Sequence, residues 1–420
     1  MNAVQNLVQR DRDIAGLATI LDPERLANAV QAQMGEALIE DLRLDYIRYK
    51  PGMNCIARLV VRIADRSVSA YAKAHGPDAK CKMQKATIRT VSETEFGPGR
   101  ILLDDEKIVF SIFPNDAKIR AMQSLADERR RVKLLSHVFG KDCRLHDVEF
   151  DQSLNYKPER RYVVRLKRSG ADFALLKFHT RQGYHRALCN QPVANVIGHS
   201  ERRGVIAYRW VAGETLRNIS RSGKMEHCHI NATARALAEF HSGATDTMAL
   251  QDRTAQIDAI ESLGAQISFL LPHLQARVVR AARRLAVWLQ DHKPVHSPVH
   301  GDFYDKQVVI RDEGAVLIDM DEARVDDPLA DLGNFIAHVE RQVVSGTLSA
   351  CECQQQTEDL VSCYRLHKGV VSEPRLRHFV ALGLFHLLHQ PFRDFEESWP
   401  EKIQEILMRV EELIGGEEII

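Results

Sequence analysis

The residues best suited to chemistry in this sequence lie in the run His300–Gln307 and in the short segment Ile318–Asp321. Each segment carries an acid, Asp302 in the first and Asp319 in the second, and Gln307 adds an amide oxygen. In metal-assisted phosphoryl transfer, one carboxylate accepts or orients the proton of the attacking hydroxyl, while a second acid and an amide oxygen hold Mg²⁺ against the phosphates. The pattern therefore predicts phosphoryl transfer, with Asp302 as the base and with Gln307 and Asp319 as metal ligands.

A β-hairpin is expected to bring these two segments together. Residues 308–310 and 315–318 have the composition of short apolar strands, and a polar turn that ends in Gly separates them. Gln307 follows Asp302 by only five positions, so one loop can supply both the base and a metal ligand. The hairpin then returns the chain to the same edge, where Asp319 follows the second strand.

The two segments resemble the catalytic and metal-binding loops of the aminoglycoside phosphotransferase and choline kinase family, which is related to protein kinases. That family carries His-Gly-Asp, four residues, Asn, and then a strand followed by Ile-Asp. The resemblance implies that Asp302 is the catalytic residue and that Asp319 is the principal Mg²⁺ ligand. Gln307 stands where the family usually has Asn, and it keeps the amide oxygen but adds one methylene group. Asp321 is expected to assist a second metal ion.

A third motif of the same family follows at residues 327–332, which read Asp-Pro-Leu-Ala-Asp-Leu. The family carries Asp-Pro, two residues and Asp-Leu after its metal-binding loop. The resemblance implies that Asp331 braces the catalytic loop through hydrogen bonds and that His300 organises the same loop. Three motifs in this order are far more specific than a lone His-Gly-Asp. The resemblance extends over roughly residues 150–392.

The nucleotide is expected on a small antiparallel sheet in residues 148–212. The resemblance implies that Lys177, on its third strand, binds the α- and β-phosphates, and that backbone groups of Trp210 and Val211 meet the adenine edge at the hinge. Arg160 or Arg161 could supply phosphate contacts, because a planar guanidinium suits phosphate oxygens. The alternatives are a solvated edge-strand Lys and a solvated turn Arg.

Two features of kinases are missing from this predicted sheet. Residues 181–200 hold no Asp or Glu, so the Glu that usually pairs with the third-strand Lys is absent or comes from elsewhere, with Glu201 as a candidate. The turn at residues 158–161 reads Pro-Glu-Arg-Arg and is not a Gly-rich phosphate loop. Relatives of the family often lack that loop, so its absence is compatible with the resemblance.

The same succession of strands also occurs earlier in the chain. The tripeptide Tyr-Lys-Pro at residues 49–51 recurs at residues 156–158, and Lys73 takes the place of Lys177 on the third strand. The spacing of about 105 residues predicts an internal duplication. Chance likeness is the alternative, because antiparallel strands share the same alternation. The first copy has no catalytic loop after it, and we expect it to cap the second module or to lean over the substrate cleft.

These elements predict an α+β protein with a protein-kinase-like two-lobe fold and an extra N-terminal copy of the sheet module. The expected parts are a helical segment at 1–40, a sheet module with a helical linker at 41–147, an ATP-binding lobe at 148–212 and a helical catalytic lobe at 213–420. Within them, a long helical region is expected at about 117–139 and a helical stretch at 184–197. The segment Ala234–His241 resembles a family helix that packs beneath the catalytic loop.

The composition argues against several other classes of protein. A chain of 420 residues with 45% hydrophobic and 27% charged residues is typical of globular proteins. No run of about 18 uncharged apolar residues predicts a membrane span, and residues 1–12 lack the apolar core of a signal peptide. The eight Cys are irregularly spaced, which favours reduced thiols and a cytoplasmic protein.

The formal net charge is zero, but residues 1–212 are basic and residues 213–420 are acidic. A lobe that neutralises nucleotide phosphates, followed by a lobe that collects carboxylates, accounts for this asymmetry. The Arg-rich run at 128–131 lies in a helical pattern typical of a solvated face. We therefore expect neither nucleic acid nor membrane as a partner, and a nucleic-acid-binding protein is the least favoured interpretation.

The sequence thus predicts an ATP-dependent phosphotransferase that uses ATP and Mg²⁺ to phosphorylate a hydroxyl of a small molecule. Aminoglycosides, sugars and amino alcohols all stay open as acceptors. The alternative is a pseudokinase, which binds nucleotide or acts as a scaffold without turnover. The missing helix Glu, the Gln at position 307 and the duplicated sheet favour this alternative.

Overall fold

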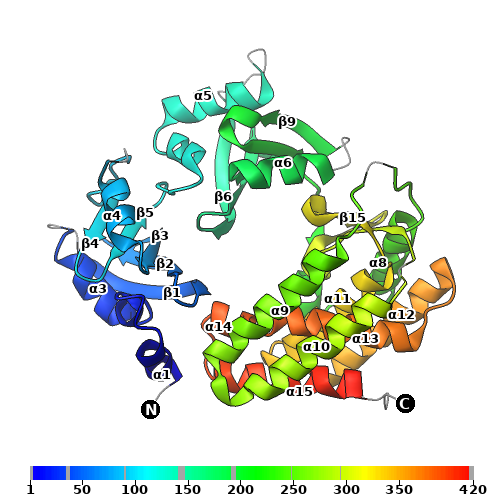
Figure 1. The fold of residues 1–420 in the computed structure, drawn as a ribbon. Helices are drawn as coiled ribbons and strands as arrows, with labels where there is room; N and C mark the ends of the chain where they lie inside the picture. The colour runs from blue at the N-terminus through cyan, green and yellow to red at the C-terminus, as the bar shows by residue number, and fades with distance from the viewer. Residues whose placement is uncertain are drawn as a thin grey trace. The chain divides into compact units, whose positions relative to one another are not determined.

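The computed structural model describes residues 3–34, 38–88, 91–140, 147–190, 195–246, 248–293 and 295–415. The chain forms two compact units (Figure 1). Unit 1 holds Met1–His185, Val193–Trp210 and Phe392–Glu397, and unit 2 holds Arg186–Pro192, Val211–Pro391 and Ser398–Ile420. Within the described ranges, no helix combines the length and the apolar character needed to cross a membrane.

Unit 1 is built on two five-stranded antiparallel sheets. The first contains β1 (Ile39–Lys50), β2 (Asn54–Ile63), β3 (Arg66–His75), β4 (Arg100–Leu103) and β5 (Ile108–Ile112). The second contains β6 (Val148–Lys157), β7 (Arg161–Arg168), β8 (Ala171–His179), β9 (Val196–Ser200) and β10 (Val205–Arg209). Their strand orders are β1-β2-β3-β5-β4 and β6-β7-β8-β10-β9, so the two sheets have the same topology (Figure 1).

Short helices flank these strands. They are α1 (Ala3–Arg10), α2 (Leu17–Ile20), α3 (Pro23–Gln31), α4 (Ala79–Ile88), η1 (Arg120–Leu125), α5 (Glu128–Phe139), α6 (Arg181–Asn190) and η3 (Glu201–Arg203). The helical region expected at about 117–139 is divided into η1 and α5, because the Asp127 side chain accepts a hydrogen bond from the Arg130 N–H and starts α5 as a separate helix. The helix expected at 184–197 is wrong at its end, where Val196 begins β9 and pairs with β10. Residues 191–194 of that stretch lie outside the described residues.

A buried aspartate anchors the first turn of the first sheet. The Asp11 carboxylate accepts hydrogen bonds from the Tyr49 hydroxyl, at 2.5 Å, and from the backbone N–H of Gly52, at 2.9 Å. Gly52 lies in the β1–β2 turn with φ of 66°, a left-handed conformation that glycine adopts without a steric cost. The aspartate therefore fixes the turn to the helical segment that precedes the sheet.

The second sheet has the same arrangement. Asp116 accepts hydrogen bonds from the Tyr156 hydroxyl, at 2.9 Å, and from the backbone N–H of Glu159, at 2.8 Å. Glu159 takes the place of the turn glycine and keeps its left-handed conformation, with φ of 58°. These likenesses support the predicted duplication, which stays an interpretation. They also extend it to the segments that carry Asp11 and Asp116, since each precedes its sheet by a similar distance.

One buried apolar cluster spans both sheets of unit 1. Its members from the first sheet are Ile56 and Tyr71, and its members from the connecting segment are Ile119, Ala121, Met122, Leu134, Leu135 and Val138. The second sheet adds Tyr156, Tyr162, Val164, Leu166, Ala174, Leu176, Phe178, Val205 and Ala207. Because these side chains exclude water together, burial of each sheet depends on the other.

Unit 2 is mainly helical. Its helices are α7 (Leu216–Arg221), α8 (His227–Phe240), α9 (Arg253–Leu270), η4 (Pro272–Leu274), α10 (Gln275–Asp291), η5 (Asp305–Gln307), η6 (Met320–Glu322), α11 (Leu329–Val344), α12 (Ala350–Lys368), α13 (Glu373–Leu387) and α15 (Trp399–Gly415). The short α14 (Gln390–Arg393) crosses from unit 2 into the segment assigned to unit 1. Together with the two sheets of unit 1, this composition confirms the predicted α+β class.

Short strands in unit 2 border the loop 300–307 and the segment 318–321. They are β11 (Glu214–Thr215), β12 (Ser297–Val299), β13 (Val308–Arg311), β14 (Gly314–Leu317) and β15 (Arg324–Asp326). The predicted hairpin is β13 and β14, and β11 pairs with β13. β12 pairs with β15, so the strand that enters the catalytic loop lies beside the strand that leaves the metal-binding loop. The helices α11 and α13 pack closely against each other. The absence of a side chain at Gly333 permits this contact, since a Cβ atom there would collide with the backbone of Phe379.

Candidate active site

Asp331, at the start of α11, holds the beginning of the catalytic loop. Its carboxylate accepts hydrogen bonds from the backbone N–H groups of His300, at 2.6 Å, and Gly301, at 2.9 Å, and lies 3.0 Å from Nε2 of His241. Burial acts to raise the pKa of Asp331, but the hydrogen bond and the charge of His241 bring it below its ordinary value. These contacts are the ones that a bracing role of Asp331 requires.

His300 connects the loop 300–307 to the segment 318–321. Its ring is fully buried, and Nε2 lies 2.8 Å from the carbonyl oxygen of Ile318. Because a carbonyl oxygen only accepts, Nε2 carries the proton, and Nδ1 is then free to accept from the backbone N–H of Asp302 at 3.4 Å. Gly301 lets the loop pass close to the backbone of Glu322, since a Cβ atom at this position would lie 2.2 Å from the carbonyl oxygen of Glu322.

The hairpin places Gln307 and Asp319 at the same end. The register pairs Val308 with Leu317, and the backbone N–H of Ile318 donates to the carbonyl oxygen of Gln307 at 2.9 Å. Gln307 is therefore opposite the residue that directly precedes Asp319. Asp319 has φ of 63° and ψ of 53°, a left-handed conformation that is uncommon outside glycine and that occurs repeatedly at functional sites.

The Tyr304 hydroxyl is influenced by both Asp302 and Asp319. Burial is the main reason why the pKa of the Tyr304 hydroxyl is raised, and the negative charges of Asp302 and Asp319 raise it further. Both carboxylates therefore lie close enough to act on one hydroxyl. The Tyr304 ring stacks on His338 of α11, with 4.2 Å between ring centroids, and burial lowers the pKa of His338 to about 3, so this ring stays neutral. The sequence analysis did not identify Tyr304, which no motif marks.

A second set of contacts holds the later part of the loop. Asp305 is almost fully buried, and its carboxylate accepts from Nε of Arg217, at 2.5 Å, and from Nε2 of Gln342, at 3.1 Å. The side-chain amide of Asn334 donates to the carbonyl oxygen of Phe303 at 2.9 Å. The loop is thus fixed to α7 and α11. Sequence reasoning missed these residues because the partners are far apart in the chain.

The donors near the hairpin fit Mg²⁺. Asp321 is a buried residue of η6, two positions after Asp319. The amide oxygen of Gln307 is a third oxygen donor. Across the described part of the chain, no group of three or more His, Cys, Asp or Glu side chains is placed to hold a metal by itself. Mg²⁺ does not need such a cage, because it usually binds one or two carboxylates, several waters and the phosphates of a substrate.

Lys177 is a central residue of the second sheet in unit 1. It lies on β8, opposite Val163 of β7 and Ile206 of β10, and it is only 3% exposed. Its Nζ lies 4.8 Å from the centre of the Tyr208 ring. The alternative of a solvated edge lysine is therefore wrong. The proposed acidic partner, Glu201, lies 3.8 Å from Nε2 of His185.

The other expected nucleotide contacts lie at the borders of the second sheet. Arg161 is the first residue of β7 and is partly exposed. The backbone N–H of Trp210 donates to the carbonyl oxygen of Phe173 at 3.3 Å, so adenine recognition at Trp210 would fall to its carbonyl group. The Arg165 guanidinium lies 5.5 Å from the centre of the Trp210 ring. Val211 is the first residue of unit 2 after the sheet and is partly exposed.

This site combines the buried Asp331, the exposed carboxylate of Asp302 and a hairpin that carries oxygen donors at its open end. Phosphotransferases use groups of these kinds. Residues 143–350 match the model of the phosphotransferase enzyme family. The resemblance expected from the three motifs is thus confirmed. The match begins close to the start of the second sheet and ends within α12. No curated protein matches this chain.

Several solved structures are similar to this chain. They include a choline/ethanolamine kinase family protein from Mesorhizobium loti, with 17% identity, a TM-score of 0.47 and coverage of 68% of this chain and 94% of that one. The choline kinase LicA from Streptococcus pneumoniae has 16% identity, a TM-score of 0.45 and coverage of 69% and 98%. A thermostable mutant of aminoglycoside phosphotransferase APH(4)-Ia, in a ternary complex with AMP-PNP and hygromycin B, has 16% identity, a TM-score of 0.44 and coverage of 68% and 99%.

Proposed function

We propose that the protein is an ATP-dependent phosphotransferase that moves the γ-phosphate of ATP to a hydroxyl group of a small molecule. The observation that carries this proposal is the hairpin register, which sets Gln307 opposite Ile318 and therefore beside Asp319. Both Asp302 and Asp319 raise the pKa of Tyr304, which is consistent with one common site for these two carboxylates.

In the proposed reaction, the oxygen of the acceptor hydroxyl attacks the γ-phosphorus. The bond between this phosphorus and the β,γ-bridging oxygen breaks, ADP leaves with that electron pair, and Asp302 receives or orients the hydroxyl proton. Asp302 suits this task because it is exposed while the loop around it is fixed by buried hydrogen bonds. Mg²⁺, held by Asp319 and Gln307, would neutralise charge on the phosphates, and Asp321 would assist a second metal ion.

The proposal assigns the nucleotide to the second sheet. Lys177 would bind the α- and β-phosphates, as the third-strand lysine of kinases does, from its position on the central strand β8. Arg161 would add a phosphate contact from the start of β7, and Trp210 and Val211 would meet the adenine edge. These assignments stay proposals that nucleotide-binding measurements can test.

For the acceptor, we propose an alcohol on an amino alcohol, an aminoglycoside or a sugar. The similar structures are described as a choline kinase and as an aminoglycoside phosphotransferase bound to hygromycin B. The acidic composition of residues 213–420 mildly favours a cationic acceptor.

The test is ATP consumption with a panel of these acceptors, using wild-type protein, Asp302→Asn and Asp312→Asn. Asp312 lies in the exposed hairpin turn and serves as a matched control. Because general-base catalysis contributes about 10²–10⁴-fold, Asp302→Asn is expected to lose at least about a hundredfold in kcat, while Asp312→Asn keeps the wild-type rate. Equal activity of wild type and Asp302→Asn on the true acceptor would refute the role of Asp302.

The same experiment addresses the pseudokinase alternative. The specific feature in its favour is Gln307, whose extra methylene group changes the reach of one metal ligand. If Mg-ATP stabilises the wild-type protein against heat but no acceptor in the panel supports turnover, the chain is a nucleotide-binding protein without transferase activity. Asp319→Asn should then abolish the Mg²⁺ dependence of that stabilisation.

A further inference from the structure

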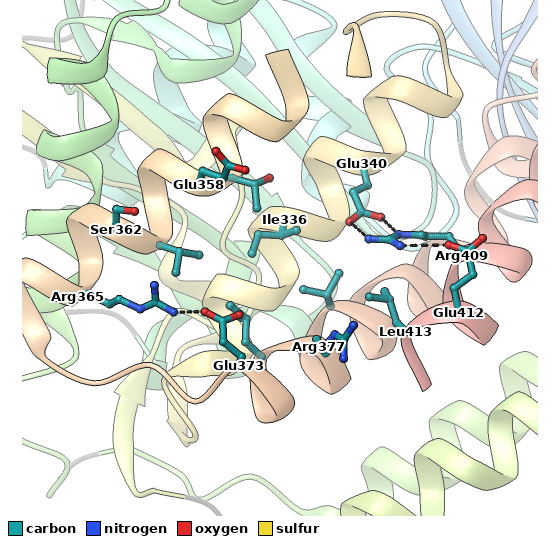
Figure 2. Close-up of a pocket in the computed structure, with 14 residues that line it drawn as sticks. Ile336, Glu340, Glu358, Ser362, Arg365, Glu373, Arg377, Arg409, Glu412 and Leu413 are labelled. Carbon is teal, nitrogen blue, oxygen red and sulfur yellow. Dashed lines mark hydrogen bonds and ion pairs between the residues drawn. The ribbon is translucent and has the colours of Figure 1, made fainter. Parts of the chain in front are cut away.

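Two pockets outside the candidate active site differ in how their charges are balanced. The first lies among α11, α12, α13 and α15 of unit 2 (Figure 2). Its Arg409 pairs with Glu340 at 3.0 Å and with Glu412 at 3.1 Å, and its Arg365 pairs with Glu373. Arg409 and Arg365 thus already have acidic partners, so neither side chain gives a reason to expect an anionic ligand in this pocket.

The second pocket lies in the first sheet module of unit 1 and has a volume of about 600 Å³. It is bounded by the β1–β2 turn, β3, the loop Gly76–Asp78, α4 and residues 117–118. Five Lys or Arg residues line it, namely Lys73, Lys82, Lys85, Arg100 and Lys118. Its carboxylates are Asp78 and Glu159. Pockets of roughly 300–1,000 Å³ are typical of small-molecule sites, and this one has an excess of positive charge.

The floor of this pocket is formed by Lys73 and Glu159. Nζ of Lys73 lies 2.8 and 2.9 Å from the two carboxylate oxygens of Glu159. The same carboxylate lies 3.4 Å from Lys118 and 3.9 Å from Arg48. One carboxylate cannot neutralise three cations, so positive charge is left over at the bottom of the pocket.

The rim of the pocket adds further cations. Lys82 and Lys85 are exposed residues of α4, three positions apart and therefore on the same side of the helix. His75 lies near them, and burial, Lys73 and Lys82 lower its pKa to about 4. Protonation of His75 is thus disfavoured in this positive field, which agrees with the excess of cations that the geometry shows.

One part of the pocket wall is apolar. Tyr71, Val109 and Ala86 line it, and Tyr71 and Val109 are buried in the module. An anionic group can therefore meet the lysines while an uncharged body of the same molecule covers the apolar wall. This combination is the usual arrangement of a site for a small polar ligand.

We propose that this pocket binds a small phosphate-bearing molecule, with its phosphate held by Lys82, Lys85 and Lys118. A phosphate monoester carries nearly two negative charges at neutral pH and three strong acceptor oxygens. Lysine binds phosphate as a flexible point charge, and several lysines can surround one dianion. The proposal does not depend on the proposed phosphotransferase function, because none of these residues belongs to the candidate active site.

The test is calorimetric titration of the full-length protein with pyrophosphate, AMP and citrate. The variant is Lys82→Gln/Lys85→Gln, and the matched control is Lys80→Gln, an exposed lysine of the same helix that does not line the pocket. Because the double variant removes charge-assisted hydrogen bonds to the phosphate, it is expected to weaken pyrophosphate or AMP binding by about tenfold or more. Lys80→Gln should bind as the wild type does.

Amide hydrogen exchange with bound pyrophosphate adds a second readout, with protection expected at residues 76–88. The proposal is overturned if neither phosphate compound binds at millimolar concentration, or if the double variant binds as tightly as the wild type. Equal losses in the double variant and in Lys80→Gln would show general charge attraction and would also overturn it. Citrate binding as tight as pyrophosphate binding would show that the site has no preference for phosphate.

Discussion

Glu159 offers the sharpest test of how the two sheets of unit 1 are joined. It lies in the β6–β7 turn, and its carboxylate is 2% exposed and paired with Lys73, Lys118 and Arg48. Its backbone has φ of 58°, which costs a residue with a side chain about 1–2 kcal/mol relative to glycine. The ion pairs and the backbone strain therefore oppose each other at one position.

The magnitudes can be separated with two substitutions. Glu159→Gln removes the charge but keeps the strain, and the loss of one partner from a buried ion pair costs about 3–5 kcal/mol. Lys118 is 58% exposed, so its share is small, and we expect a destabilisation of about 3 kcal/mol. Glu159→Gly removes the same ion pairs but relieves the strain, so we expect a loss of about 2 kcal/mol. The hydrogen bond from the backbone N–H to Asp116 stays available in both variants.

The assay is urea unfolding, with hydrogen exchange of the β3 and β7 amides to report on unit 1 separately. Glu149→Gln, an exposed glutamate on β6, is the matched control and should unfold as the wild type does. Burial acts to raise the pKa of Glu159, but Lys73 brings it below its ordinary value. The stabilisation should therefore be present above about pH 4.5 and be lost as the pH falls through the lowered pKa. A Glu159→Gly protein at least as stable as the wild type would refute this reasoning.

Two further predictions concern the candidate active site. Asp331→Asn should lower the free energy of unfolding by about 1–3 kcal/mol, because the new amide N–H₂ must face a buried backbone N–H of His300 or Gly301. Unchanged urea unfolding would contradict the idea that Asp331 holds this loop. Gln307→Asn should keep activity and lower the Mg²⁺ concentration for half-maximal rate, since it restores the ligand that the family usually carries; loss of activity across a Mg²⁺ titration would show that the longer Gln is needed.

Much of the fold follows from local patterns in the sequence. Alternating apolar residues correctly predict the inner strands of both sheets, and the segment between residues 308 and 318 correctly predicts the hairpin β13–β14. These features are accessible because residues close in sequence determine them: side-chain alternation marks strands, and a polar Gly-containing turn marks a hairpin. The α+β class and the family resemblance are confirmed for the same reason.

Other features depend on contacts between distant residues and leave no local signal. The sequence places Glu159 in a turn, but nothing in that turn indicates that its partner is Lys73, 86 positions earlier. The ion pair of Asp305 with Arg217 and the stacking of Tyr304 on His338 are equally invisible from the motifs. The misplaced end of the helix expected at 184–197 has a related cause, because the pairing of β9 with β10 overrides local propensity.

The common core of the two sheets has a consequence for the history of the chain. The family match begins at residue 143, yet Asp116, Ile119 and Met122, which complete the second sheet, lie before that point, and Tyr71 reaches the same core from the first sheet. A gene trimmed to the family boundary would encode a sheet with a bare apolar face and an unsupported turn. Because the second sheet relies on side chains of the first, natural selection for solubility alone would preserve both sheets, even in descendants where the first sheet bound no ligand.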